Sequence, residues 1–295
     1  MPELANGWIK RISVTPPSLK DNTADADRLE KALEAVLNAE IADIDLTISG
    51  ILPELLRRNN FNLRCILFKD HKKWRLAGIT GDDDTIVAGL AVDLGTTTVV
   101  LRMLDLSTGR TMAEYSFGNP QISIGPDILT RIHFAEKENG LKTIQGLIID
   151  GINRAIGELC KSGGINPSGI YLLSVAGNTA MTHLFLGLNP RFLIREPYIP
   201  ATNRPGCLNA RELGINVNQS AKVFVFPNTG SYFGGDLIAG ILYSGLNRSE
   251  KTAILVDVGT NAEVVLGNKN WLVACAGAAG PALEGGVTKM GMMAG

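Results

Sequence analysis

The chain has 295 residues, of which 45% are hydrophobic and 19% are charged, and its formal net charge is −1 at pH 7. This length exceeds that of one ordinary domain core, so we expect two or three globular units. The balanced charge argues against a nucleic-acid binder, and no apolar run approaches the roughly 20 residues that cross a bilayer. Because the polar N-terminal segment is no signal peptide, we expect a cytoplasmic protein with no nucleic-acid or membrane partner.

Residues 1–87 predict a small α/β unit. Pro16 and Pro17 exclude a regular helix near its start. Beyond them, leucines at helical spacing and then alternating apolar residues predict helices followed by a hairpin. The predicted helices lie at 29–37 and 52–56, and the predicted strands at 63–68 and 74–79. The acidic segment 81–84 is the expected linker to the rest of the chain.

From Ala88 onward, short apolar strands alternate with helices, a pattern typical of a sheet covered on both faces. Helices are predicted at 127–139, 141–161 and 236–246, and strands at 171–176 and 222–227. We expect the first of these helices to end at Gly140 and the second at Gly163 and Gly164, because glycine is common just past a helix C-terminus. The sequence therefore predicts an α/β fold.

Two segments of the chain, 89–110 and 253–273, share one plan. Each has an apolar strand that ends in Asp-x-Gly-Thr, then a second strand, a turn and a third strand. Such internal similarity indicates a duplicated unit, with two related lobes that face each other across a cleft. We assign residues 88–250 to the first lobe and residues 251–295 to the start of a second lobe, which we expect to be truncated.

Each Asp-x-Gly-Thr turn offers what a phosphate group needs. Gly95 and Gly259 permit close backbone approach, so that successive N–H groups can hold an anion. Asp93 and Asp257 are candidates to hold Mg²⁺ through its water shell, because Mg²⁺ keeps several waters. Two facing turns would clamp the phosphates of ATP. The candidate phosphate-binding residues are Gly95, Thr96, Thr97, Thr98, Gly259, Thr260 and Asn261.

Three further positions have two interpretations each. Asn178 either caps a helix or touches the γ-phosphate or its attacking water. Asp236 follows two glycines, and it either caps a helix or meets Mg²⁺ opposite Asp93. Glu284, Gly285 and Gly286 belong to a glycine-rich segment that either closes over phosphate or is disordered. The candidate catalytic residues are Asp93, Asp257, Asp236 and Asn178.

Several segments resemble motifs of the actin, sugar-kinase and heat-shock-chaperone (ASKHA) superfamily, and within it the reductive activators of corrinoid proteins. Residues 93–98 match the first phosphate motif of that superfamily and residues 257–260 the second. The resemblance covers nearly the whole chain and implies ribonuclease H-like ATPase lobes after a small α/β domain. The segments are PPSLKDN, AVDLGTTTV, NPQISIGPDILTRI, VAGNTAMTHLFLG, GGDLIAGIL, VDVGTNAEV and AGPALEGG.

The resemblance also implies a function. It predicts ATP and Mg²⁺ as cofactors, ATP-dependent reduction of a corrinoid protein from Co(II) to Co(I), and an external electron donor. Members of that family carry a ferredoxin-like domain with a [2Fe–2S] cluster, but Cys65, Cys160, Cys207 and Cys275 are widely scattered, so no cluster is expected in this chain. A small-molecule kinase of the same superfamily and a non-catalytic docking or dimerisation module, including a homodimer, stay open as alternatives.

Overall fold

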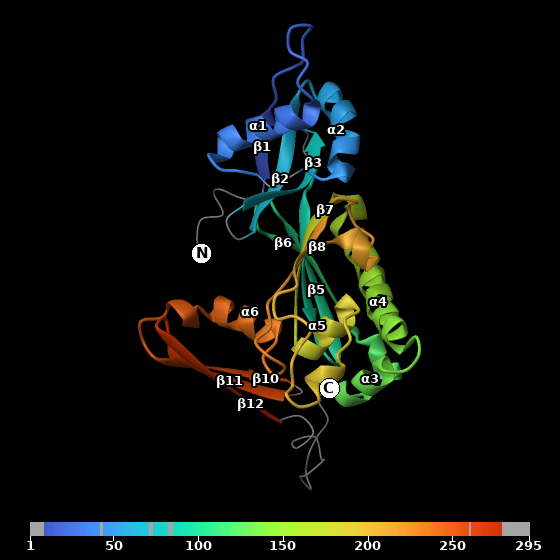
Figure 1. The fold of residues 1–295 in the computed structure, drawn as a ribbon, viewed down its shortest axis with the longest axis vertical. Coiled ribbons are helices and arrows are strands. Elements are labelled where there is room, and N and C mark those ends of the chain that lie inside the picture. Colours follow the sequence, from blue (N-terminus) through green and yellow to red (C-terminus); the bar gives the residue numbers. More distant parts are fainter. Residues whose placement is uncertain (1–8, 42–43, 71–72, 82–84, 260, 279–295) are drawn as a thin grey trace.

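The computed structural model describes residues 9–41, 44–70, 73–81, 85–259 and 261–278. These residues form three sheets with helices packed on them, which confirms the predicted α/β fold. Figure 1 shows the first sheet and its helices at the top, a six-stranded sheet in the middle, and the third sheet at the lower left. The middle sheet therefore joins the other two.

The first unit is a three-stranded antiparallel sheet covered by two helices. Its core contains the helical stripe of Leu29 and Leu33 together with Leu52 and Leu56, all of them buried. Both predicted helices and the predicted hairpin are confirmed, whereas the first strand lay in a segment for which no strand was predicted. The elements are β1 (Ile9–Ser13), α1 (Asp25–Leu37), α2 (Leu46–Arg58), β2 (Asn62–Asp70) and β3 (Lys73–Gly81).

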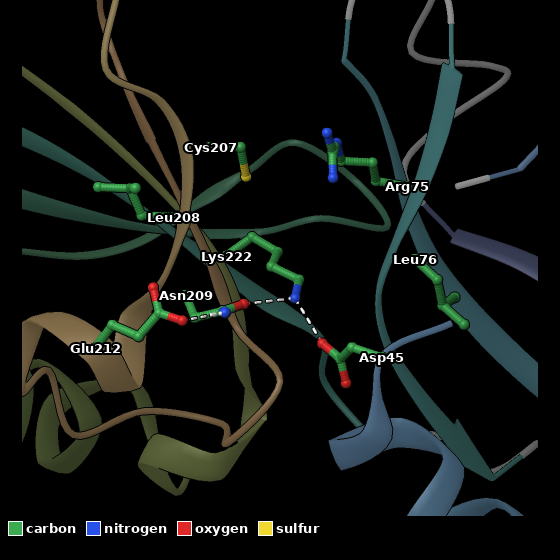
Figure 2. A pocket seen from close by; sticks show the side chains of 8 residues that line it. All are labelled: Asp45, Arg75, Leu76, Cys207, Leu208, Asn209, Glu212 and Lys222. Carbon is green, nitrogen blue, oxygen red and sulfur yellow. Dashed lines mark hydrogen bonds and ion pairs between the residues drawn. The ribbon is translucent and has the colours of Figure 1, made fainter. Parts of the chain in front are cut away.

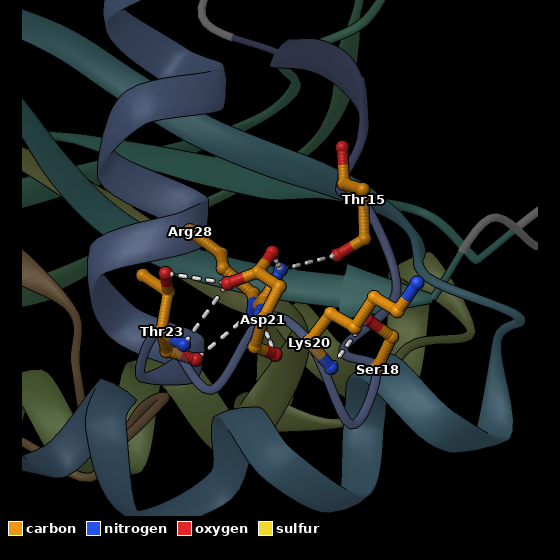
Figure 3. Close-up of polar contacts among 6 residues, drawn as sticks. All are labelled: Thr15, Ser18, Lys20, Asp21, Thr23 and Arg28. Atoms are coloured by element: carbon orange, nitrogen blue, oxygen red, sulfur yellow. Dashed lines mark hydrogen bonds and ion pairs between the residues drawn. The ribbon is translucent and has the colours of Figure 1, made fainter.

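A buried arginine fixes the turn between β1 and α1 (Figure 3). Arg28 donates to the Asp21 carboxylate at 2.7 Å, to the Asp21 carbonyl at 2.7 Å and to the carbonyls of Thr15 and Thr23. The hydrogen bond from Arg28, aided by Thr23, holds the pKa of the Asp21 carboxyl well below its usual range. The PPSLKDN segment is thereby tied to the helix that follows it.

The middle sheet has the strand order β6-β5-β4-β7-β9-β8. The central strands β4, β7 and β9 run parallel, and the flanking strands are antiparallel to their neighbours. Parallel strands end at the same edge of a sheet, so the loops after β4, β7 and β9 meet there. The bounds are β4 (Ala88–Leu94), β5 (Thr98–Asp105), β6 (Thr111–Gly118), β7 (Ile170–Gly177), β8 (Gly206–Asn209) and β9 (Lys222–Val225).

Three helices pack on one face of this sheet: α3 (Ile128–Ala135), α4 (Gly140–Gly163) and α5 (Thr179–Leu186). The predicted end of α4 is confirmed, since Gly164 follows it with a left-handed φ of 66°. The predicted end of α3 at Gly140 is wrong. Gly140 instead begins α4, where a Cβ would lie 2.0 Å from the Phe134 carbonyl oxygen. None of the helices within the described ranges is long and apolar enough to cross a membrane.

The third sheet repeats the plan of β4, β5 and β6. It consists of β10 (Ala253–Val258), β11 (Asn261–Asn268) and β12 (Trp271–Ala278), all antiparallel. Helix α6 (Gly235–Ser244) contacts both β7 and β10, and its Leu237 and Ile241 pack on Val265. The predicted internal repeat is therefore confirmed for the described strands, and α6 connects the two copies.

The second face of the middle sheet is only partly covered. Helix α6 lies on the opposite side from α4 (Figure 1). The rest of this face lines a groove of about 490 Å³, whose apolar side chains include Leu104, Leu172 and Phe224. Among the described residues, the predicted cover of both faces is therefore confirmed where α6 lies and not over this groove.

A partly buried lysine joins the first unit to the middle sheet (Figure 2). Lys222 on β9 donates to the Asp45 carboxylate of α2's N-terminus and to the Asn209 side-chain oxygen, both at 2.6 Å. The three side chains line a cavity of about 270 Å³ between the two units. Beside it, Tyr171 packs with Ile66 in an apolar cluster.

We predict that Lys222→Met lowers the free energy of unfolding by about 1–2 kcal/mol at pH 7, because it leaves Asp45 without its cation. Burial raises the pKa of Asp45, but hydrogen bonds from Lys222 and from the Ile48 N–H outweigh it and lower that pKa below its usual value. A carboxyl with a lowered folded pKa stabilises the fold above the unfolded pKa, near 4, and loses this effect at lower pH. Urea unfolding should therefore show the loss at pH 7 and a smaller one below pH 4.

The matched control is Lys161→Met, which removes a surface ion pair with Glu158 from a lysine side chain that is 74% exposed. That variant should unfold like the wild type. Equal losses in both variants would contradict a specific role for Lys222.

Candidate functional site

The turn between β4 and β5 presents free backbone N–H groups. Asn119 donates from Nδ2 to the Gly95 carbonyl at 2.9 Å and from its backbone N–H to the Thr97 carbonyl at 2.7 Å. The N–H groups of Gly95, Thr96 and Thr97 have no acceptor among the described residues. A side chain at Gly95 would lie 2.3 Å from the Thr98 carbonyl oxygen, so glycine is required there. With its carbonyls held behind it, the turn can bind an anion in front.

Asn178 caps α5, which confirms one of its two predicted roles, whereas its contact with the γ-phosphate or the attacking water stays a prediction. Its Oδ1 accepts a hydrogen bond from the Met181 N–H at 2.9 Å and so caps α5, while its Nδ2 donates to the Thr96 hydroxyl at 3.0 Å. The Thr96 side chain is buried by this contact, whereas Thr97 and Thr98 are exposed. The positive end of α5 thus lies against the turn, where it favours a negative charge.

Four carboxylates approach one another in front of the turn. Burial, together with the charges of Asp93 and Asp257, raises the pKa of Asp236 to about 6. Burial also raises the pKa of Glu263 to about 6, with contributions from Asp236 and Asp257. Asp93 is open to solvent, yet the surrounding protein removes enough water to raise its pKa, and Asp257 adds to this. Carboxylates that repel one another in this way favour a cation.

The arrangement fits a hydrated cation better than a fully protein-bound one. In the described part of the chain, no three His, Cys, Asp or Glu side chains are close enough together to hold a metal ion. Mg²⁺ usually keeps several waters and is held by one or two carboxylates. The residues present therefore suit Mg²⁺ bound largely through its waters.

Asp236 reaches this group because α6 begins very close to β7. A side chain at Gly234 would lie 2.3 Å from the Asn178 Cα and 2.5 Å from the Gly177 carbonyl oxygen. Gly234 is the helix cap, and Asp236 lies in the first turn, where its Oδ1 accepts from the Leu237 N–H at 2.8 Å. Asp236 is therefore in the acidic group as well as at the helix N-terminus.

The second turn is described in part. Asp257 lies near the end of β10, Gly259 follows that strand, and Asn261 begins β11. The two turns approach each other, since the charge of Asp257 acts on Asp93. Outside the described residues lie Thr260, Glu284, Gly285, Gly286 and the side chain of Asn261.

Sequence reasoning missed Glu263, Asn119 and Arg131. Glu263 had a usable signal, because it lies directly opposite Asp257 in the β10–β11 register, and opposite residues share a face of the sheet. Asn119 and Arg131 both lie in the quoted segment NPQISIGPDILTRI, but their place behind the first turn depends on how the connection from β6 to α4 folds.

Comparison with known families agrees with this geometry. Residues 88–249 match the RACo middle region, residues 8–85 the RACo linker region, and residues 251–295 the C-terminal domain of RACo, the ASKHA domain. The chain belongs to the RACo family. This membership places residues 251–295 in an ASKHA domain, in agreement with the predicted superfamily.

Relatives with named functions are longer than this chain. It is 34% identical over 207 residues to the corrinoid activation enzyme RamQ of Eubacterium limosum. The aligned region covers 70% of this chain and 35% of that protein. It is 27% identical over 224 residues to a [Co(II) methylated amine-specific corrinoid protein] reductase of Methanosarcina barkeri, with 70% and 39% covered.

A solved structure, a reductive activator for corrinoid, iron–sulfur protein, superposes with a TM-score of 0.85 at 36% identity. The match covers 97% of this chain and 46% of that one. The chain thus spans less than half the length of each of these RACo relatives.

We predict that Asp236→Asn stabilises the cation-free protein at neutral pH. A carboxyl whose folded pKa is about 6 destabilises the fold once the pH exceeds its unfolded pKa, near 4, and fully so above 6. The variant should therefore raise the free energy of unfolding by on the order of 1–2 kcal/mol at pH 7.5 and have little effect near pH 4.

Thermal unfolding with and without millimolar Mg²⁺ checks this. Mg²⁺ should stabilise the wild type at pH 7.5 more than the variant, because it relieves the same repulsion. The control Asp150→Asn alters an exposed carboxyl on α4 and should leave both responses unchanged. An Asp236→Asn variant that is less stable than wild type at pH 7.5 would rule out the proposed repulsion.

Proposed function

We propose that this chain binds Mg-ATP between its two Asp-x-Gly-Thr turns and acts in ATP-dependent reductive activation of a corrinoid protein. The main support for this proposal is that the free N–H groups of Gly95, Thr96 and Thr97 face a group of mutually repelling carboxylates. Anion-binding amides beside a cation-binding acidic group suit a magnesium nucleotide.

The roles divide among the residues as follows. Thr97 and Thr98 offer exposed hydroxyls to a phosphate oxygen, and Asn178 keeps the Thr96 hydroxyl in place. Asp93 and Asp257 would hold the waters of Mg²⁺ from the two lobes. Bound Mg²⁺ neutralises phosphate charge. The candidate phosphate-binding positions Gly259, Thr260, Asn261, Glu284, Gly285 and Gly286 belong to the same proposal.

ATP would act through conformation. The two turns belong to different sheets that α6 connects, so a ligand held by both fixes the angle between the lobes. A corrinoid protein docked on the lobes would respond to that angle, and an external donor would supply the one electron that converts Co(II) to Co(I). The named activities of the relatives support a corrinoid protein as the substrate. The proposed structural units are residues 1–87, 88–250 and 251–295.

We predict that the chain binds Mg-ATP and that Asp93→Asn weakens this binding about tenfold or more, because the water shell of Mg²⁺ loses an acceptor. Isothermal calorimetry at pH 7.5 measures the dissociation constants. Asp150→Asn is the matched control, since it makes the same change on the exposed side of α4. Absence of binding to the wild type, or equal binding by Asp93→Asn, would contradict the proposed site.

We also predict that Mg-ATP speeds the formation of Co(I). The assay combines the chain with a methylated-amine-specific corrinoid protein in its Co(II) state and titanium(III) citrate as donor, and it follows Co(I) by visible absorbance. Asp93→Asn should reduce the stimulation by ATP about tenfold. Equal rates with and without ATP, together with phosphorylation of a sugar or acetate, would instead favour the kinase alternative.

A further inference from the structure

The most unusual buried group outside the acidic site is the guanidinium of Arg131 on α3. The side chain is 0% exposed, and in the described part of the chain no carboxylate lies within ion-pair distance of it. Its Nη2 has no hydrogen-bond partner among the described residues. Burial lowers the pKa of Arg131 to about 10, and only the charge of Asp127 opposes this. A buried arginine normally has its donors satisfied, so this one calls for an explanation.

The groups that do contact Arg131 lead to the first phosphate turn. Its Nε donates to the Gly125 carbonyl at 2.9 Å, and its Nη1 lies 3.4 Å from both Gln121 Oε1 and Met181 Sδ. Gln121 is also fully buried and donates from Nε2 to the Ile144 carbonyl at 2.9 Å, so both ends of its amide are fixed.

Gln121 belongs to a short 3₁₀ turn, η2 (Pro120–Ser123), that Asn119 begins. The Gln121 N–H donates to Asn119 Oδ1 at 3.0 Å, which leaves Asn119 Nδ2 to face the Gly95 carbonyl. Met181 Sδ lies between the two ends of this chain, near both Asn119 Nδ2 and Arg131 Nη1. Arg131, Gln121 and Asn119 thus form one buried polar connection.

We infer that Arg131 is a positioning residue for the phosphate turn, acting through Gln121 and Asn119 to hold the turn's carbonyls backward and its N–H groups forward. This inference rests on the proposed nucleotide site and deepens it. The buried positive charge has a second effect, which is electrostatic. Because Arg131 has no carboxylate partner among the described residues, its charge attracts a phosphate in front of the turn. Both effects favour the same ligand.

The experiment compares Arg131→Met, which keeps the length and loses the charge, with Arg131→Lys, which keeps the charge. Mg-ATP dissociation constants are measured at a temperature where each variant is folded. We expect about tenfold weaker binding for Arg131→Met, partial rescue by Arg131→Lys, and no further loss when Gln121→Met is added to Arg131→Met.

A matched control separates positioning from stability. Arg28 is also buried and also fixes a turn, but it lies in the first unit, so Arg28→Met should lower the melting temperature and leave the dissociation constant unchanged. If Arg131→Met fails to fold, Gln121→Met alone tests the same connection. Binding of wild-type strength by folded Arg131→Met or Gln121→Met would overturn the inference.

A second measurement needs no nucleotide. Hydrogen exchange of the Asn119 N–H, which donates to the Thr97 carbonyl, should be about tenfold faster in Arg131→Met or Gln121→Met. The Phe226 N–H, which donates to the Val175 carbonyl, is the internal reference and should not change. Unchanged exchange at Asn119 would overturn the inference even if the wild type bound no Mg-ATP, whereas faster exchange without binding would overturn the proposed function alone.

Discussion

The site depends on the parallel register between β4 and β7. Leu94 lies beside Gly177 in this register, so the turn after β4 and the start of α5 leave the sheet at the same edge. This is why Asn178 can cap α5 and still reach the Thr96 hydroxyl. The same edge receives α6, because Gly234 has no side chain to collide with the end of β7. The pairing of β4 with β7 therefore brings the positive N-terminal end of α5 and the carboxylate of Asp236 to the same edge of the sheet.

Helix α6 links this edge of the middle sheet to the third sheet. It packs on β7 and β10, which belong to different sheets, and it places Asp236 where the charges of both Asp93 and Asp257 act on it. The mutual repulsion of these carboxylates opposes close approach of the lobes, and a cation between them removes that opposition. Under the proposed function, the apposition of the lobes would thus be coupled to occupancy of the site, which is the property that a conformational ATPase requires.

Much of the fold followed from short-range patterns. Helical spacing predicted α1 and α4, and the repeated Asp-x-Gly-Thr plan predicted the hairpins at Asp93 and Asp257. Strands β1 and β8 were missed because each is short and is defined by its pairing partner. The buried support of the first turn was out of reach for a different reason: Asn119 and Arg131 are distant in sequence from Gly95, and only the packing of η2 against the turn joins them.

In the proposed nucleotide site, the distribution of charge favours one form of the ligand. Behind the first turn lie the uncompensated Arg131 and the positive end of α5, whereas Asp93, Asp236, Asp257 and Glu263 lie in front. Free ATP would meet the repulsion of the carboxylates, and free Mg²⁺ would lack the phosphate oxygens that complete its shell. Under the proposed function, the magnesium nucleotide would satisfy both requirements at once, and each component would increase the affinity for the other by the same factor. Such a site would discriminate against uncomplexed nucleotide without any side chain that excludes it.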